Sequence, residues 1–456
     1  MLIKTLIQRF PNTAKGSFWF GFGFCLLTCF SIIFVISPLT GLSKPFGGAG
    51  HDGYLEIARS VAKGNGFVCE PGQPPVACPP LYPLFLSLMT LLPEGLQRPC
   101  LIVFQSAMVG GIAFLVFLIG KSLFSSSIAR IAVAIFLMNP WVHWSAKNPM
   151  TPVMQSFLYI IFAFLMGRYV FGVLKGLDDP INKKRWHPMW LAIGLVGGAL
   201  ALTHGSMLPA AFILLFVAFI LGLIRRNKRL LATVVMSGCV MVALIAPWTY
   251  RNWVVFGRFL PVAGNYGFAY ACSLAHWNIS GEHAQRPNES YHASGLRFMG
   301  IEGDESRYVQ YYGLKDPNLD AKFNEKAKEH IRAHPGMFLK KFILNSIEYY
   351  FPSLTYPFLA VKHFSMENLA LTVYHLILWG LAVIGFYRIR RQKPEFLHAI
   401  LVLVVIFLYA VWYWPFITFI GHSLYTFGTM PFLSILAANG FCRAFGESYL
   451  SQTSAS

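Results

Sequence analysis

Ten apolar runs, most of them close to the length that crosses a bilayer, alternate with polar segments along the chain. They cover residues 18–36, 100–120, 128–144, 154–173, 189–208, 209–224, 230–248, 369–387, 396–414 and 424–441. A spanning segment is helical because lipid offers its backbone polar groups no hydrogen-bond partner, and it needs about 20 mostly apolar residues to cross a hydrocarbon core of about 30 Å. The pattern predicts an all-α polytopic membrane protein with about ten transmembrane helices.

A further apolar run, from Leu81 to Leu92, is short for a crossing and is bounded by Pro79-Pro80 and Pro93. We expect a half-buried or surface-lying helix there. Excluding this run from the spans puts all the main basic clusters on one side of the membrane, which the positive-inside rule predicts to be cytosolic. These clusters are Lys4/Arg9/Lys15, Lys121/Arg130, Lys175/Lys183/Lys184/Arg185, Arg225/Arg226/Lys228/Arg229 and Arg388/Arg390/Arg391/Lys393.

This topology predicts cytosolic termini, a periplasmic active site and a location in the inner (plasma) membrane. We expect three parts. Residues 1–248 form a bundle that includes the first outer loop 38–99, residues 249–368 form an extracytoplasmic subdomain, and residues 369–456 form the last helices.

Residues 18–36 are read as a retained first span, because no small-residue cleavage site follows them. In the subdomain we expect an amphipathic helix from Asp320 to His334, capped by Asp320, whose apolar face docks on the membrane body.

Composition agrees with a chain that lies mostly in lipid, since 55% of residues are hydrophobic and only 12% are charged. The net charge of +18 would suggest nucleic acid in a soluble protein. Here the topology accounts for most of the cations, so no nucleic-acid partner is expected. Cys69 and Cys78 flank a proline-rich stretch in the first outer loop, where oxidation is permitted, and the sequence allows a disulfide between them.

Two carboxylates in the first outer loop are candidates for a general base. Asp52 and Glu56 are four residues apart and share a face if residues 53–63 are helical. The alternative is that Asp52 caps this helix and Glu56 is a solvated neighbour.

Several cations occur in the outward segments despite the positive-inside rule, and an anionic ligand would account for them: Lys44, Arg59, Lys63, Lys147, Arg251 and Arg258. Arg251 follows Pro247-Trp248 at the outer end of a span, where a guanidinium can hold a phosphate through two hydrogen bonds. The alternative is an arginine that reaches the lipid headgroups. The histidines are scattered and neither zinc nor calcium spacing is present, so no metal or other cofactor is predicted.

A carboxylate beside fixed cations suits sugar transfer from a polyprenyl phosphate to a hydroxyl acceptor. The base removes the proton of the attacking hydroxyl, and the cations stabilise the charge that develops on the departing phosphate. Phosphate leaves without a general acid, so one carboxylate can suffice where a glycosidase uses two.

The first outer loop resembles that of the bacterial GT-C glycosyltransferases, which are relatives of protein O-mannosyltransferases and of lipid A aminoarabinose transferase. The resemblance rests on these motifs: His51-Asp52-Gly53-Tyr54, Gly64-Asn65-Gly66-Phe67, Pro79-Pro80-Leu81-Tyr82-Pro83, Asn139-Pro140, Pro247-Trp248-Thr249-Tyr250-Arg251-Asn252 and Phe256-Gly257-Arg258-Phe259. It implies a polyprenyl (undecaprenyl) phosphate sugar donor, an inverting reaction with Asp52 as base, and a lipid-phosphate contact by Arg251. Tyr82 of the proline motif joins the candidate substrate-binding residues.

The chain also departs from this pattern. Cys78 stands where relatives often have a cation before the Pro-Pro pair, and His204-Gly205 replaces an Arg-Pro pattern. Residues 143–155 contain no acid, so a metal shared between two outer loops is not expected. Residues 426–431 lack the Arg-Tyr pair common in the last span. We therefore count His204 among the candidate phosphate contacts. Lys44, Lys63 or Lys147 could substitute for the missing cations, and the alternative for these lysines is that they anchor the chain at the lipid headgroups.

Two other functions stay open at the level of sequence. A transporter or flippase of an anionic lipid-linked glycan would also use outer cations, but no internal repeat is evident. A glycan ligase or polymerase would use the same lipid chemistry on a whole oligosaccharide. The sugar and the acceptor, which could be a lipid, a glycan or a protein, are not specified by any motif.

Overall fold

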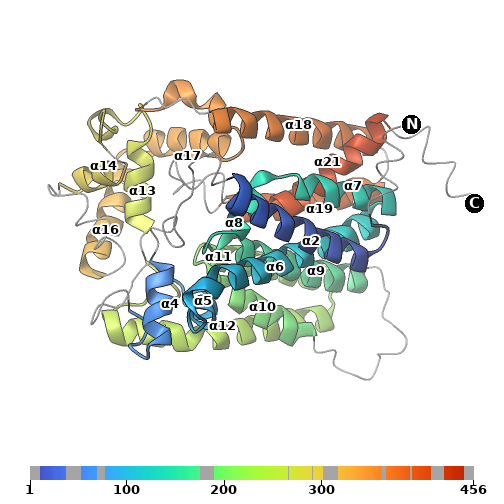
Figure 1. Ribbon diagram of the computed structural model, residues 1–456, viewed down its shortest axis with the longest axis horizontal. Coiled ribbons are helices and arrows are strands. Elements are labelled where there is room, and N and C mark those ends of the chain that lie inside the picture. Colours follow the sequence, from blue (N-terminus) through green and yellow to red (C-terminus); the bar gives the residue numbers. More distant parts are fainter. Residues whose placement is uncertain are drawn as a thin grey trace, which may run out of the picture.

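The structure is a computed structural model of the 456-residue chain. It describes residues 11–36, 53–68, 78–174, 189–264, 266–289, 291–300, 317–361, 366–390, 393–411 and 426–445. Helices run along the long axis of the molecule in one part, and a smaller helical group that includes α13, α14 and α16 lies at one end (Figure 1).

Among the described residues, ten apolar helices form the bundle and correspond to the ten predicted runs. They are α2 (Ala14–Ser31), α6 (Glu94–Leu123), α7 (Ser126–Leu137), α9 (Pro152–Leu174), α10 (Met189–Thr203), α11 (Met207–Ile224), α12 (Lys228–Phe256), α18 (Met366–Ile389), α19 (Lys393–Ala410) and α21 (Met430–Phe445). Within the described ranges, six helices are long and apolar enough to cross a membrane by length and composition alone. A polytopic helical bundle is thus confirmed.

Several predicted boundaries were wrong, and local chemistry explains the differences. The run 128–144 is divided at Asn139, whose side chain accepts a hydrogen bond from the Trp141 amide at 2.9 Å and so starts a new helix, α8 (Pro140–Ala146). The boundary between the fifth and sixth runs lies at residues 204–206 instead of 208/209. Helix α12 continues beyond Trp248 to Phe256, where Gly257 ends it with a φ of 63°.

The helices cross the bundle in alternating directions, which gathers cations at one end. Short turns join α6 to α7 and α11 to α12, so each pair reverses direction. Cations at this end, here called the basic end, include Lys15, Lys121, Arg130, Arg168, Arg225, Arg226, Lys228, Arg229, Arg388, Arg390 and Arg443. The predicted clustering on one side of the bundle is therefore confirmed for these residues. The opposite end is called the subdomain end.

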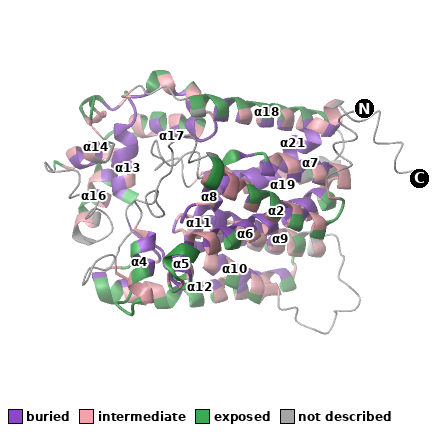
Figure 2. Ribbon diagram, viewed as in Figure 1, coloured by how far each residue is buried: buried purple, intermediate pink, exposed green. Residues whose placement is uncertain are grey.

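Small residues allow the bundle helices to approach closely. A Cβ added to Gly110 of α6 would lie 2.8 Å from the Phe18 carbonyl oxygen of α2, and one added to Gly194 of α10 would lie 2.6 Å from the Ser237 carbonyl oxygen of α12. Close backbone approach through glycine is typical of helix pairs in membranes. Buried residues accordingly follow the inner faces of the helices, whereas exposed residues lie along outward faces such as those of α12 and α18 (Figure 2).

The subdomain contains α13 (Tyr266–Ala275), α14 (Tyr291–Phe298), α16 (Pro317–Ala333) and α17 (Pro335–Tyr350). Helix α16 begins at Pro317, so Asp320 lies inside it and the predicted cap was wrong. Its apolar face, with Phe323 and Ala327 buried, packs on α13 instead of the membrane body.

Candidate functional site

Two short helices of the first outer loop pack as a unit at the subdomain end. They are α4 (Tyr54–Ala62) and α5 (Leu81–Thr90), and the Tyr54 and Tyr82 rings meet edge to face at 5.5 Å. Helix α5 also packs on α6 and presents Leu88, which is 59% exposed, to the outside. The expectation of a short helix that does not cross the bundle is confirmed.

The start of α4 lies directly after Asp52 in the sequence. Gly53, with a φ of 70°, occupies the N-cap position and makes no side-chain cap. Glu56 is exposed in its first turn. Asp52 and Lys44 themselves lie outside the described residues, as does Cys69 and with it the disulfide that the sequence allows. Glu56 therefore belongs to the helix, and whether Asp52 shares a face with it stays a prediction.

Tyr82 anchors this unit to a second loop. Its side chain is fully buried, and its hydroxyl donates to Gln105 Oε1 at 3.4 Å. The Gln105 amide nitrogen donates in turn to the carbonyl oxygens of Ala146 and Asn148, at 3.1 and 2.8 Å. Lys147 lies between these two residues, so the bridge fixes the loop that carries this candidate cation. The Tyr82 side chain therefore packs inside the protein and does not face open space.

Arg251 connects the first outer loop, through Phe67, to α12. Its guanidinium carbon lies 4.7 Å from the Trp248 ring centroid and 5.8 Å from that of Phe67. One terminal nitrogen donates to the Phe67 carbonyl oxygen at 3.4 Å and the other donates to Asn252 Oδ1 at 3.0 Å. Stacking on aromatic faces holds the planar guanidinium in a fixed orientation.

The end of α12 is tied to the chain that follows it. The Trp248 indole donates to the Val262 carbonyl oxygen at 2.8 Å, and the Asn252 amide donates to those of Leu260 and Val262 at 2.9 and 3.1 Å. Gly205, beside His204, faces the same segment, since a Cβ added there would lie 3.9 Å from Val262 Cβ. The α10–α11 turn and the Arg251 region are thus neighbours.

His204 lies in that turn, and its Nδ1 is 2.8 Å from Ser206 Oγ. Burial lowers the pKa of His204 to about 4, so the imidazole is neutral at neutral pH. A neutral imidazole can form hydrogen bonds but does not supply the positive charge of the arginine that it replaces.

The remaining candidates are more peripheral. Lys63 is the exposed C-cap of α4, and Arg258 is partly exposed directly after the Gly257 cap of α12. Cys78 is buried among the apolar side chains of α4 and α5, so this position, where relatives often have a cation, has a packing role here.

Gln105, Phe67 and Asn252 were missed as site-forming residues. A glutamine inside an apolar span was a usable signal, because its side chain tends to form hydrogen bonds to neighbouring segments.

The subdomain contains a buried polar network between α13 and α17. The Lys341 ammonium donates to Ser273 Oγ at 3.2 Å, and the Asn345 amide donates to the same oxygen at 3.0 Å. His276 Nε2 lies 2.9 Å from Glu348 Oε1. Lys341 is fully buried. Such a network fixes the position of α17, which leads into α18.

This network predicts that the subdomain is more stable at alkaline pH. Burial lowers the pKa of Lys341 from 10.5 to about 7. Between these values the unfolded chain binds more protons than the folded one, so stability rises with pH from about 7 to 10.5. Burial, with the charges of His334, His283 and Lys341, lowers the pKa of His330 from 6.5 to about 4, which adds a rise between those values.

Hydrogen exchange of α13 and α17 in the full chain, followed from acid to alkaline pH, would measure this dependence. Lys341→Met should flatten the alkaline rise, whereas Lys340→Met, an exposed neighbour, should leave it unchanged. An unaltered profile in Lys341→Met would contradict the assignment.

Comparison with known proteins shows what fold this geometry belongs to. No protein-family model and no curated protein sequence matches the chain. The archaeal oligosaccharyltransferase AglB from Archaeoglobus fulgidus, solved with an inhibitory peptide and a dolichol-phosphate, matches with a TM-score of 0.55 and 11% identity over 96% of this chain and 51% of that chain. Its apo form matches with a TM-score of 0.54 and 13% identity, over 96% and 52%.

The form of the Archaeoglobus enzyme with Zn and sulfate matches with a TM-score of 0.50 and 12% identity, over 95% and 52%. The chain thus spans about half the length of these three solved structures. It has the GT-C fold, as the sequence resemblance implied.

In the described part of the chain, no group of three or more His, Cys, Asp or Glu side chains could hold a metal ion.

Proposed function

We propose that this protein is a membrane glycosyltransferase that moves a sugar from a polyprenyl (undecaprenyl) phosphate to a hydroxyl acceptor at the subdomain end. Asp52 acts as the general base, and the configuration at the anomeric carbon is inverted. The observation that carries the proposal is the double anchoring of the first outer loop. Phe67 ties it to Arg251, and Tyr82 with Gln105 ties it to the loop of Lys147.

This anchoring suits a reaction in which a base and a leaving phosphate must keep a fixed separation. Asp52 immediately precedes the N-cap of α4, and α4 packs on α5. The cations that the two anchors hold come from α12 and from the α8–α9 connection. Fixed cations near a departing phosphate stabilise the charge it acquires without reorganising during the reaction.

The roles of the other candidates follow from their surroundings. Lys147 and Arg251 are proposed phosphate contacts, and Lys44, Lys63 and Arg258 are proposed to attract the anionic donor. Neutral His204 and exposed Glu56 are proposed hydrogen-bonding groups for the sugar or the acceptor. Tyr82 is retained as an anchor of the loop.

A second candidate function is transfer of an assembled oligosaccharide. It is favoured by the likeness in fold to the Archaeoglobus oligosaccharyltransferase. In either case we propose that the basic end faces the cytosol and that the protein lies in the inner membrane, since cytoplasmic loops carry the excess of Lys and Arg.

The test uses the purified protein in liposomes with polyprenyl phosphates that carry one sugar or an oligosaccharide. Release of polyprenyl phosphate coupled to glycosylation of a hydroxyl acceptor supports transfer, and the donor consumed tells the two candidates apart. Movement of intact donor across the bilayer without bond cleavage would contradict both and favour a flippase. Because no metal is required by the proposal, addition of a chelator should leave the rate of transfer unchanged.

Arg251→Gln should raise the KM for the donor about tenfold or more, the effect of losing a charge-assisted hydrogen bond to phosphate. Phe67→Leu, which removes only an aromatic partner of Arg251, should raise it less. Arg226→Gln at the basic end is the matched control and should leave the KM unchanged. An Arg251→Gln enzyme with the wild-type KM would remove Arg251 from the binding site.

A further inference from the structure

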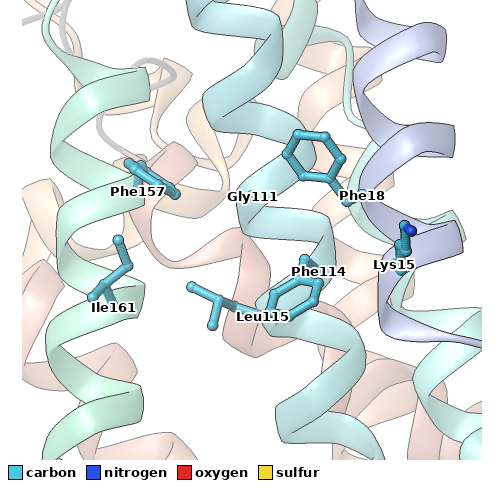
Figure 3. A pocket seen from close by; sticks show the side chains of 7 residues that line it. All are labelled: Lys15, Phe18, Gly111, Phe114, Leu115, Phe157 and Ile161. Atoms are coloured by element: carbon cyan, nitrogen blue, oxygen red, sulfur yellow. The ribbon is translucent and has the colours of Figure 1, made fainter.

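A second binding site is indicated far from the proposed active site, on the outer surface of the bundle. A groove of about 400 Å³ lies between α2, α6 and α9. Apart from one cation its lining is apolar, and consists of Lys15, Phe18, Gly111, Phe114, Leu115, Phe157 and Ile161. Figure 3 shows Gly111 on the central helix, with Phe157 and Ile161 on one side and Phe18 and Lys15 on the other.

Gly111 lines this groove on α6. A Cβ added there would lie 2.5 Å from Phe157 Cε2, so the absence of a side chain lets the Phe157 ring of α9 pack directly on the α6 backbone. The residues that line the groove on each helix are one turn apart, namely 111 and 115 on α6 and 157 and 161 on α9. The groove therefore runs along the helix axes, as an acyl chain in the bilayer does.

Each of the three helices carries a cation toward the basic end of the groove. Lys15 lines it at the start of α2. Lys121 of α6 and Arg168 of α9 follow Phe114 and Ile161 by seven residues, which places each on the same helix face about two turns nearer the basic end. All three are exposed, and the sequences of the three helices contain no acid except Glu94 at the opposite end of α6.

We propose that this groove binds one anionic phospholipid, with an acyl chain along Gly111 and the phosphate between Lys15, Lys121 and Arg168. The apolar lining excludes a polar occupant, and the three cations select for a net negative headgroup over a zwitterionic one. The lipid-linked sugar donor does not suit the groove, because its phosphate would then lie at the basic end, away from Arg251 and Asp52.

The test measures which lipids remain bound to the full chain. The purified protein is equilibrated with equal amounts of phosphatidylglycerol and phosphatidylcholine that have identical acyl chains, and bound lipid is identified by native mass spectrometry. Wild type should retain one phosphatidylglycerol in preference to phosphatidylcholine. Lys15→Gln should lower that preference about fivefold, the factor for one cation near an anionic lipid surface. Lys228→Gln, which removes an exposed cation of α12 at the same end, should not change it.

A second pair of variants tests the apolar part of the site. Ile161→Trp fills the groove and should lower the retained amount of both lipids, whereas Ile220→Trp on the exposed face of α11 should not. Retention at the bulk ratio in wild type, or unchanged retention in both Lys15→Gln and Ile161→Trp, would overturn the proposal. Displacement of phosphatidylglycerol by added undecaprenyl phosphate would overturn it in favour of the donor. These outcomes do not depend on whether the protein transfers sugar.

Discussion

Asp52→Asn should lower the rate of sugar transfer by about 10²–10⁴-fold, the usual contribution of a general base. Asparagine has nearly the size of aspartate but cannot accept the proton of the attacking hydroxyl. The KM for the donor should change little, because binding of the phosphate is assigned to Arg251 and Lys147. Initial rates with purified wild type and variant at saturating donor measure the effect.

Two other carboxylates make this prediction specific. Glu94→Gln changes an exposed carboxylate at the same end of the bundle and should keep the wild-type rate. Glu56→Gln changes the competing candidate, which lies in the first turn of α4. If Glu56→Gln abolished transfer and Asp52→Asn did not, the role of base would pass to Glu56.

Gly440→Ala should destabilise the protein by about 3 kcal/mol, the upper end of the usual cost of overpacking. A Cβ at Gly440 of α21 would overlap the Leu381 carbonyl oxygen of α18, and a backbone atom cannot turn away as a flexible side chain can. Gly385 of α18 meets Gly440 at the same crossing. The added methyl group must therefore separate the two helices.

Gly380→Ala is the matched control, since nothing lies within 4 Å of a Cβ added at that position of α18. It should be neutral or slightly stabilising, because alanine favours a helix by about 0.5–1 kcal/mol over glycine. Thermal unfolding in one detergent compares the two variants. Equal melting temperatures would show that the α18–α21 crossing is not as close as described.

The fold was predictable from the sequence where the length of apolar runs and the positions of cations determine it. The length and composition of apolar runs, together with the position of cations, gave ten bundle helices and their alternation. The division at Asn139 was not predicted, although Asn139-Pro140 is a good helix start, because hydropathy alone does not register a change of direction within one apolar run.

The candidate site was predictable only in part. Asp52 and Arg251 stand out in sequence because charges are rare near spans, but the partners of Arg251 come from residues 67 and 248, which are far apart in the chain. Gln105 bridges two loops through backbone carbonyl oxygens, which any residue type provides. Contacts of this kind leave no pattern in the sequence, and so the two anchors appear only in three dimensions.

The central claim is that the subdomain end catalyses direct displacement of a sugar from a polyprenyl phosphate. The anomeric configuration of the product tests it most directly, with a donor of known configuration, wild-type protein and a hydroxyl acceptor, followed by nuclear magnetic resonance. One base and one displacement predict an inverted product, together with an equal amount of released polyprenyl phosphate. A product of retained configuration would require a second displacement, and would contradict the assignment of Asp52 as the base of a single step.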